Sequence, residues 1–178
     1  MYFTLGTIFP QESGDLFQRV LAGLTTLPLD VTVTIGDVIQ PAELGKQPPS
    51  VRIEPYLPLH DILAVSDLVV SHGGSGTVVS ALAMGRPQLL LSMGADQPDN
   101  ADRCRELGIG VDLDPFASSS VDIAVAAAAA LQKPEYRCAA RCIADEARAL
   151  PDADQAVSLL EALARTASPS KPLNPHRD

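Results

Sequence analysis

A glycine-rich turn, Ser71–Thr77, joins a short apolar run to a helix-like segment, and this order most constrains the fold. The β-branched run Leu68–Val70 predicts a strand, and residues 75–84 predict a helix. Such a turn leaves backbone N–H groups at the helix start without partners, and the helix dipole favours negative charge there. Glycines also let a ligand approach the backbone closely. The turn therefore predicts a site for an anionic group such as phosphate.

Two common phosphate motifs do not fit this turn. No Lys follows the glycines, as a P-loop requires, and Val79 stands where the dinucleotide fingerprint needs a third Gly or Ala. We therefore expect the phosphate to be held by main-chain amides and a histidine, and the residues concerned are His72, Gly74, Ser75, Gly76 and Thr77. The alternative is an ordinary tight turn closed by a hydroxyl cap, with His72 in a structural role.

Strand-like and helix-like segments alternate along the chain. Predicted strands lie at 2–5, 31–35, 51–53, 68–71, 88–91 and 109–111, and predicted helices at 15–27, 61–64, 75–84, 98–107, 119–131, 134–149 and 152–165. Such alternation predicts an α/β fold: a Rossmann-like three-layer sandwich whose parallel sheet of about six strands is covered on both faces. We expect one domain over residues 1–166 and a polar, proline-rich disordered tail over 167–178.

A second polar motif, Asp96-Gln97, follows the fifth predicted strand. Ligands bind at the carboxyl ends of parallel strands, and strands four and five, joined by one crossover helix, should be neighbours. The two turns then line one crevice, where a carboxylate and a planar amide match sugar hydroxyls. A helix cap before Pro98 is the alternative. Gly6 and Thr7 end the first strand at the same edge, where they either touch a ligand or close a turn.

Charge and cysteine content exclude several classes of function. A formal net charge of −9 argues against a broad nucleic-acid surface, which needs clustered Lys and Arg. No apolar run is long enough for a membrane span, so we expect no membrane partner. The three cysteines Cys104, Cys138 and Cys142 show no framework spacing, which favours reduced thiols, a cytoplasmic location and no metal site.

Together these segments resemble the C-terminal, donor-binding half of GT-B glycosyltransferases of family 1 type, most of all the actinobacterial enzymes that glycosylate macrolides and other natural products. The likeness spans roughly residues 2–165, and its landmarks are Phe3–Thr7, Tyr56-Leu57-Pro58, His72–Thr77, Gly85-Arg86-Pro87, Asp96-Gln97, Asn100-Ala101, Arg103 and Gly108-Ile109-Gly110. The resemblance implies an inverting transfer from a UDP- or TDP-sugar, without a metal ion or other cofactor.

The resemblance also implies a role for each landmark. His72 and the amides of residues 74–77 would hold the donor diphosphate, with Gly6 and Thr7 close by. Three further groups would complete the donor site: Tyr56, Leu57 and Pro58 at the nucleobase and ribose, and Asp96 and Gln97 at the sugar hydroxyls.

Two departures from the plant relatives concern the ribose. Leu59 stands where those relatives have a Gln after the Pro, and Ser80 stands where they have a Glu that binds the ribose hydroxyls. The nucleotide of the donor can therefore be either UDP or TDP. The resemblance places the acceptor pocket and the general base in an N-terminal domain that this sequence lacks. We therefore expect no catalytic residue in this chain, which would bind nucleotide but transfer sugar poorly or not at all.

Three other functions fit the same motifs. One is a non-catalytic module that binds nucleotide-sugars, and another is a nucleotide-sugar epimerase of the same architecture. A lipid-linked sugar transferase should carry a basic or apolar membrane-facing patch, which the acidic composition does not suggest. The acceptor, the donor sugar and the oligomeric state stay open.

Overall fold

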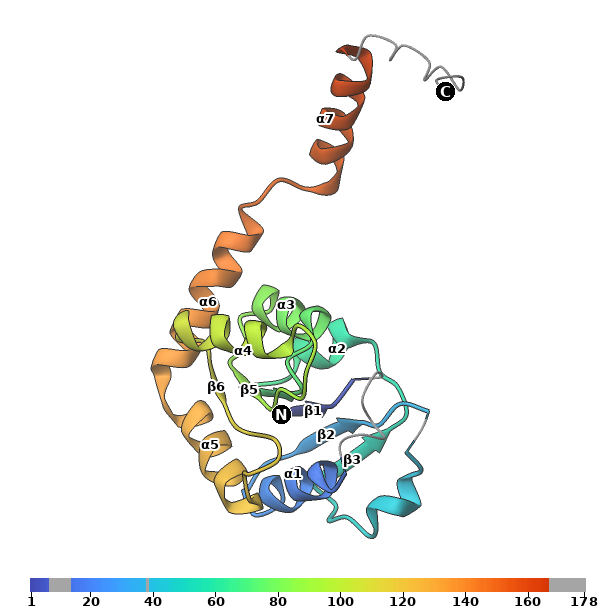
Figure 1. Cartoon of the computed structure of the whole chain (residues 1–178), viewed down its shortest axis with the longest axis vertical. Coiled ribbons are helices and arrows are strands. Elements are labelled where there is room, and N and C mark those ends of the chain that lie inside the picture. The colour runs from blue at the N-terminus through green and yellow to red at the C-terminus, as the bar shows by residue number, and fades with distance from the viewer. Residues whose placement is uncertain (7–13, 38, 167–178) are drawn as a thin grey trace, which may run out of the picture. The chain divides into compact units, whose positions relative to one another are not determined.

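The computed structural model describes residues 1–6, 14–37 and 39–166, which contain a parallel sheet flanked by helices (Figure 1). Its strands are β1 (Tyr2–Thr4), β2 (Val31–Thr34), β3 (Val51–Glu54), β4 (Val69–Ser71), β5 (Gln88–Leu90) and β6 (Gly110–Asp112). They lie in the order β3-β2-β1-β4-β5-β6, and every neighbouring pair is parallel. The predicted six-stranded parallel sheet, with strands four and five adjacent, is confirmed.

Each predicted helix is present, with its ends shifted by a few residues. The helices are α1 (Leu16–Leu24), α2 (Leu59–Ala64), α3 (Ser75–Ala83), α4 (Gln97–Glu106), α5 (Ser120–Gln132), α6 (Pro134–Arg148) and α7 (Ala153–Thr166). A 3₁₀ turn, η1 (Pro41–Leu44), lies within the stretch 40–50 that the sequence predicts as a loop. Pro41 suits its first position because that residue needs no hydrogen-bond donor.

Helices cover both faces of the sheet, which makes three layers. On one face, α1 and α5 pack on a large apolar cluster that includes Phe3 and Val70. On the other face, Val69 packs with residues of α2 and α3, and Leu90 packs with residues of α3, α4 and α6. Successive strand residues point to opposite faces, so strands buried on both faces are apolar throughout rather than alternating. This explains why β4 and β5 appear in the sequence as continuous apolar runs.

Helix α1 lies directly against the start of α5, and a glycine makes this contact possible. A Cβ built on Gly23 would lie 2.4 Å from the backbone oxygen of Ser120, far inside van der Waals contact. Any side chain at position 23 would therefore force the two helices apart.

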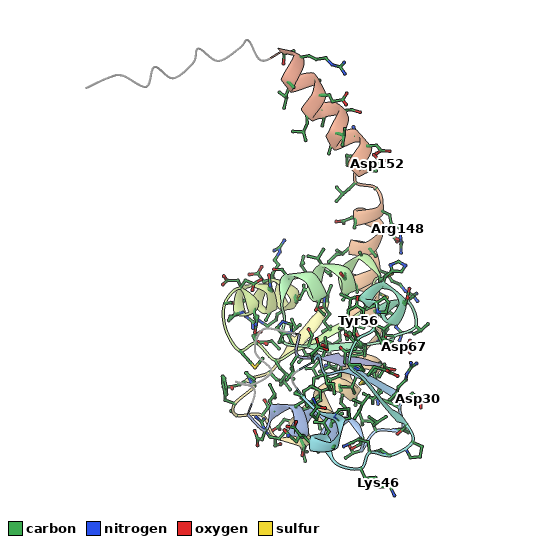
Figure 2. All side chains as sticks on the ribbon, turned by 90° about the vertical axis from the view of Figure 1, so that its right-hand side faces the viewer. Asp30, Lys46, Tyr56, Asp67, Arg148 and Asp152 are labelled. Atoms are coloured by element: carbon green, nitrogen blue, oxygen red, sulfur yellow. The ribbon has the colours of Figure 1, made fainter. Side chains whose placement is uncertain are left out.

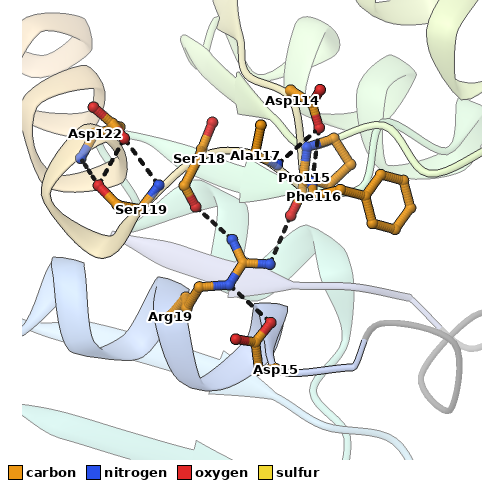
Figure 3. A network of polar contacts seen from close by, with 9 residues as sticks. All are labelled: Asp15, Arg19, Asp114, Pro115, Phe116, Ala117, Ser118, Ser119 and Asp122. Atoms are coloured by element: carbon orange, nitrogen blue, oxygen red, sulfur yellow. Dashed lines mark hydrogen bonds and ion pairs between the residues drawn. The ribbon is translucent and has the colours of Figure 1, made fainter.

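Arg19 joins α1 to the loop that leads from β6 into α5 (Figure 3). Its guanidinium donates to the backbone oxygens of Ser118 and, at 2.8 Å, of Pro115, and it pairs with Asp15 at 2.8 Å. The Arg19 side chain is 22 % exposed whereas Asp15 is 75 % exposed. The two carbonyl contacts therefore contribute most of the stabilisation, since an exposed ion pair contributes little.

The described residues fall into two compact units, with the division between Arg148 and Ala149. In the second unit, α7 has exposed apolar side chains at Val157, Leu159, Leu160 and Leu163. The predicted tail, residues 167–178, lies outside the described residues. None of the described helices is both long and apolar enough to cross a bilayer.

Candidate functional site

The order in which the chain adds strands to the sheet reverses between β1 and β4. The chain builds outward from β1 through β2 to β3, then returns to β4 on the other side of β1. In open parallel sheets, ligands bind at the carboxyl ends of the strands beside such a reversal. Thr4 pairs with Ser71 at these ends, and Gly6 and His72, which lie just beyond these strands, are side by side. The predicted phosphate turn therefore lies at the switch point.

His72 is 7 % exposed, and its imidazole fills the space between two glycines. A Cβ built on Gly6 would lie 2.5 Å from Cε1 of the ring, and one on Gly74 would lie 2.5 Å from Nε2. Gly6 also has φ = +71°, in the left-handed region that favours glycine. These glycines therefore make room for the protein's own ring, whereas the sequence suggests only that glycines make room for a ligand.

Burial also sets the protonation of this ring. It lowers the pKa of His72, an effect that the negative charge of Asp96 opposes. The ring is therefore largely neutral at pH 7 and carries one N–H. Among the residues that the structure describes, the buried Nδ1 has no hydrogen-bond partner. We assign the proton to Nε2, because an N–H at Nδ1 would have no acceptor.

Helix α3 begins beside this ring with donors that the helix does not use. Its N-cap is Gly74, which offers no side-chain cap, and the first helical bond runs from the N–H of Val78 to the oxygen of Gly74 at 3.0 Å. The N–H groups of Ser75, Gly76 and Thr77 therefore have no partner within the helix. A Cβ built on Gly76 would meet no atom within 4 Å, so the space beside it is open.

A pocket of about 230 Å³ opens at the carboxyl ends of β1, β2 and β3. It is lined by Tyr2, Thr4, Gly6, Thr34, Gly36, Asp37, Pro55, Tyr56, Leu57, Leu59 and Thr77. Tyr56, labelled in Figure 2, is 75 % exposed, so most of its side chain is open to solvent. Pro58 lies beside the lining as the N-cap of α2. The structure thus brings the predicted base-binding segment to Gly6 and Thr77, while Thr7 lies outside the described residues.

The second motif faces the phosphate turn through Asp96. Its carboxylate accepts hydrogen bonds from Oγ of Ser75 at 2.5 Å and from Nδ2 of Asn100 at 3.0 Å. These bonds, that from Ser75 first, lower the pKa of Asp96, which is exposed and ionised at neutral pH.

Gln97 behaves differently from its neighbour. It is 3 % exposed, and its Oε1 accepts from the N–H groups of Met93 at 2.8 Å and Gly94 at 3.3 Å. Its carbonyl end therefore holds the loop after β5 in shape, which leaves only the amide end for a ligand.

A second hollow of about 330 Å³ lies at the carboxyl ends of β5 and β6. Asp102, Asp112 and Asp114 are among its lining residues, together with the exposed ring of Phe116. Burial raises the pKa of Asp112. Three carboxyl groups repel an anion, so this hollow is unsuited to phosphate. Within the described residues, no group of three or more His, Cys, Asp or Glu is placed to hold a metal ion.

Tyr2 and Thr34 are among the pocket residues that the sequence did not predict as site residues. The hydroxyls of Tyr2 and Thr34 are 2.6 Å apart and buried at the floor of the 230 Å³ pocket. The available signal was strand alternation, because Tyr2 and Thr4 on one strand and Thr34 on the next point to the same face at the carboxyl edge. Asn100 was noted only as a landmark, although it bonds to both motifs.

A family model described as "Erythromycin biosynthesis protein CIII-like, C-terminal domain" matches residues 18–163. Two curated relatives, from Streptomyces and Lentzea, are similar in sequence. The elloramycin glycosyltransferase ElmGT of Streptomyces olivaceus is 41% identical over 109 residues, which cover 61% of this chain and 27% of that protein. The 4'-demethylrebeccamycin synthase of Lentzea aerocolonigenes is 31% identical over 163 residues, 92% of this chain and 38% of the relative. This chain thus spans well under half the length of these relatives.

A solved structure of a glycosyltransferase also matches this chain. The spinosyn rhamnosyltransferase SpnG, crystallised with thymidine diphosphate, superposes with a TM-score of 0.82 at 30% identity. The match covers 90% of this chain and 44% of that one. The Rossmann-like fold of the C-terminal half of a GT-B glycosyltransferase, expected from the motifs, is therefore confirmed.

Proposed function

The chain belongs to the family of erythromycin biosynthesis protein CIII-like C-terminal domains, and from that premise we propose that it binds the nucleotide-sugar donor of an inverting glycosyltransferase. The donor is a UDP- or TDP-sugar, and the acceptor is a small natural product. One observation supports this most: the free N–H groups of α3 lie at the switch point, next to a buried imidazole and a pocket.

The diphosphate occupies the open space at the start of α3. Amides of residues 75–77 and the Nε2–H of His72 donate to its oxygens, and the dipole of α3 adds to this attraction. These donors are fixed before the reaction, so they need no reorganisation when charge develops on the leaving diphosphate.

The nucleoside occupies the 230 Å³ pocket. Its base stacks on the exposed ring of Tyr56 and contacts Leu57 and Pro58, while Gly6 lies near the phosphates. Stacking is tolerant of base identity, and Ser80 stands where plant relatives use a ribose-gripping Glu. The likeness to a rhamnosyltransferase solved with thymidine diphosphate supports a TDP-sugar as donor.

The donor sugar lies between the two motifs, where Asp96 and the amide of Gln97 bind its hydroxyls. In the reaction, an acceptor hydroxyl oxygen attacks the anomeric carbon from the face opposite the diphosphate. The bond from that carbon to the diphosphate oxygen breaks, and the nucleoside diphosphate leaves with the electron pair. A general base removes the acceptor proton.

That base and the acceptor pocket belong to a companion domain. The relatives are more than twice as long as the matched segment, which supports this division. Without a companion domain to exclude water and orient an acceptor, the 178-residue chain should transfer sugar poorly or not at all.

Isothermal titration calorimetry of the 178-residue chain with TDP and with UDP tests the proposal. We expect dissociation constants between micromolar and millimolar without added metal, and much weaker binding of thymidine, which lacks the diphosphate. Absence of heat with both diphosphates, from a chain shown to be folded by circular dichroism, would contradict it.

A further inference from the structure

Three side chains connect the phosphate turn to the sugar motif, although the contacting residues are 21 to 27 positions apart along the chain. Ser75 lies in the first turn of α3, Asp96 directly precedes α4, and Asn100 lies in the first turn of α4. The Ser75 hydroxyl donates to Oδ2 of Asp96 at 2.5 Å. Asn100 Nδ2 lies 2.9 Å from the oxygen of Gly73, 3.0 Å from Oδ2 of Asp96 and 3.2 Å from Oγ of Ser75.

A count of hydrogens shows which groups are already committed. A serine hydroxyl has one proton, and here Ser75 gives it to Asp96. The hydroxyl then presents only lone pairs, which a phosphate oxygen cannot use. The Asn100 amide has two hydrogens: one serves Gly73, and the other is shared between Asp96 and Ser75. In this geometry the Ser75 side chain cannot serve the diphosphate.

The same contacts fix the orientation of the Asp96 carboxylate. Two side-chain donors converge on Oδ2, and the backbone N–H groups of Asp96 and Ser75 add to the lowering of the carboxylate's pKa. Within the described residues no hydrogen bond is made to Oδ1. The lowered pKa of Asp96 agrees with a carboxylate held in its ionised form by its neighbours. Because Asn100 also holds Gly73, the carboxylate is fixed relative to the phosphate turn as well as to its own loop.

We propose that Ser75 and Asn100 are positioning residues that aim Oδ1 of Asp96 at a hydroxyl of the donor sugar. The inference rests on the proposed function, since it assigns a specificity role within the same site. It separates two tasks of Ser75: the backbone amide serves the diphosphate, and the hydroxyl serves the sugar through Asp96.

Calorimetry with paired ligands separates these tasks. Ser75→Ala removes the hydroxyl and keeps the amide, so we expect TDP affinity to stay within twofold of wild type. Affinity for TDP-glucose should fall by about three- to tenfold, the usual worth of one hydrogen bond. Ser75→Thr keeps a hydroxyl at this exposed position and should restore the TDP-glucose affinity. Equal losses for TDP and TDP-glucose, or no loss for either, would overturn the proposal.

A double-mutant cycle checks that Ser75 acts through Asp96. Asp96→Asn alone should lower the affinity for TDP-glucose but not that for TDP. Adding Ser75→Ala should lower the TDP-glucose affinity little further, because the carboxylate that Ser75 orients is already gone. Additive losses would mean that Ser75 touches the sugar or the phosphate itself, against the proposal. Wild-type chain that binds neither ligand would instead refute the proposed function, so the two failures are distinguishable.

Discussion

Replacing His72 with alanine tests the phosphate site at its most buried donor. The ring lies at 7 % exposure between Gly6 and Gly74, so no other side chain can take its place. A hydrogen bond from Nε2–H to a charged phosphate oxygen is worth about 1.5–3 kcal/mol. Losing it should weaken TDP binding by about ten- to 150-fold. The cavity left by the imidazole also lowers the free energy of unfolding, so the variant must be shown to be folded.

Calorimetry at pH 7 measures this loss, with His60→Ala as the matched control. His60 lies on α2 and is exposed, so its removal should leave TDP affinity unchanged. Urea unfolding checks that His72→Ala is native under the assay conditions. A folded His72→Ala chain that binds TDP within twofold of wild type would refute the reasoning.

The protonation of His72 also predicts the direction in which TDP affinity changes with pH. Burial lowers the pKa of His72, so the ring is mostly neutral at pH 7. A bound diphosphate favours the protonated ring and raises this pKa in the complex. Affinity for TDP should therefore rise as pH falls through the pKa of the complex, beyond the change caused by titration of TDP itself. The His72→Ala chain supplies the reference and should lack the extra rise.

Three further predictions concern the scaffold. Gly23→Ala should lower the free energy of unfolding by about 1–3 kcal/mol in urea titrations, because its Cβ would strike the start of α5, whereas Gly76→Ala, which meets open space, should not destabilise the chain. Arg19→Ala should cost about 1–3 kcal/mol through its two carbonyl contacts, whereas Arg103→Ala, which removes an exposed ion pair, should change stability by less than about 1 kcal/mol. Burial raises the pKa of Cys104 to about 11, so only the two exposed thiols should react rapidly with a disulfide reagent at pH 8. Equal losses within either pair of variants, or three fast thiols, would contradict these accounts.

Local signals in the sequence were enough to predict the layers of the fold. The β-branched runs and the glycines after them predict strands followed by turns, and the alternation of most strands with helices predicts a parallel sheet. The stretch 40–50 was the exception, because its prolines indicate a loop while Pro41 in fact begins a 3₁₀ turn. Helix α4 also begins one residue early, at Gln97 rather than Pro98.

The chemistry within the site depended on contacts that no local pattern encodes. Sequence alone pairs Asp96 and Gln97 as similar sugar ligands, whereas the structure buries Gln97 and leaves Asp96 exposed. Sequence also assigns the Ser75 hydroxyl no partner, because Asp96 lies 21 residues away. Only the packing of α3 against α4 brings them together.

The central claim is that main-chain donors at the start of α3 bind a diphosphate. Titration of the ¹⁵N-labelled chain with TDP, followed by NMR, tests it most directly, because each amide reports separately. We predict the largest shifts at Ser75, Gly76 and Thr77, with smaller shifts along the 230 Å³ pocket. Shifts confined to the acidic hollow near Phe116, or none at the start of α3 while TDP binds, would contradict the account.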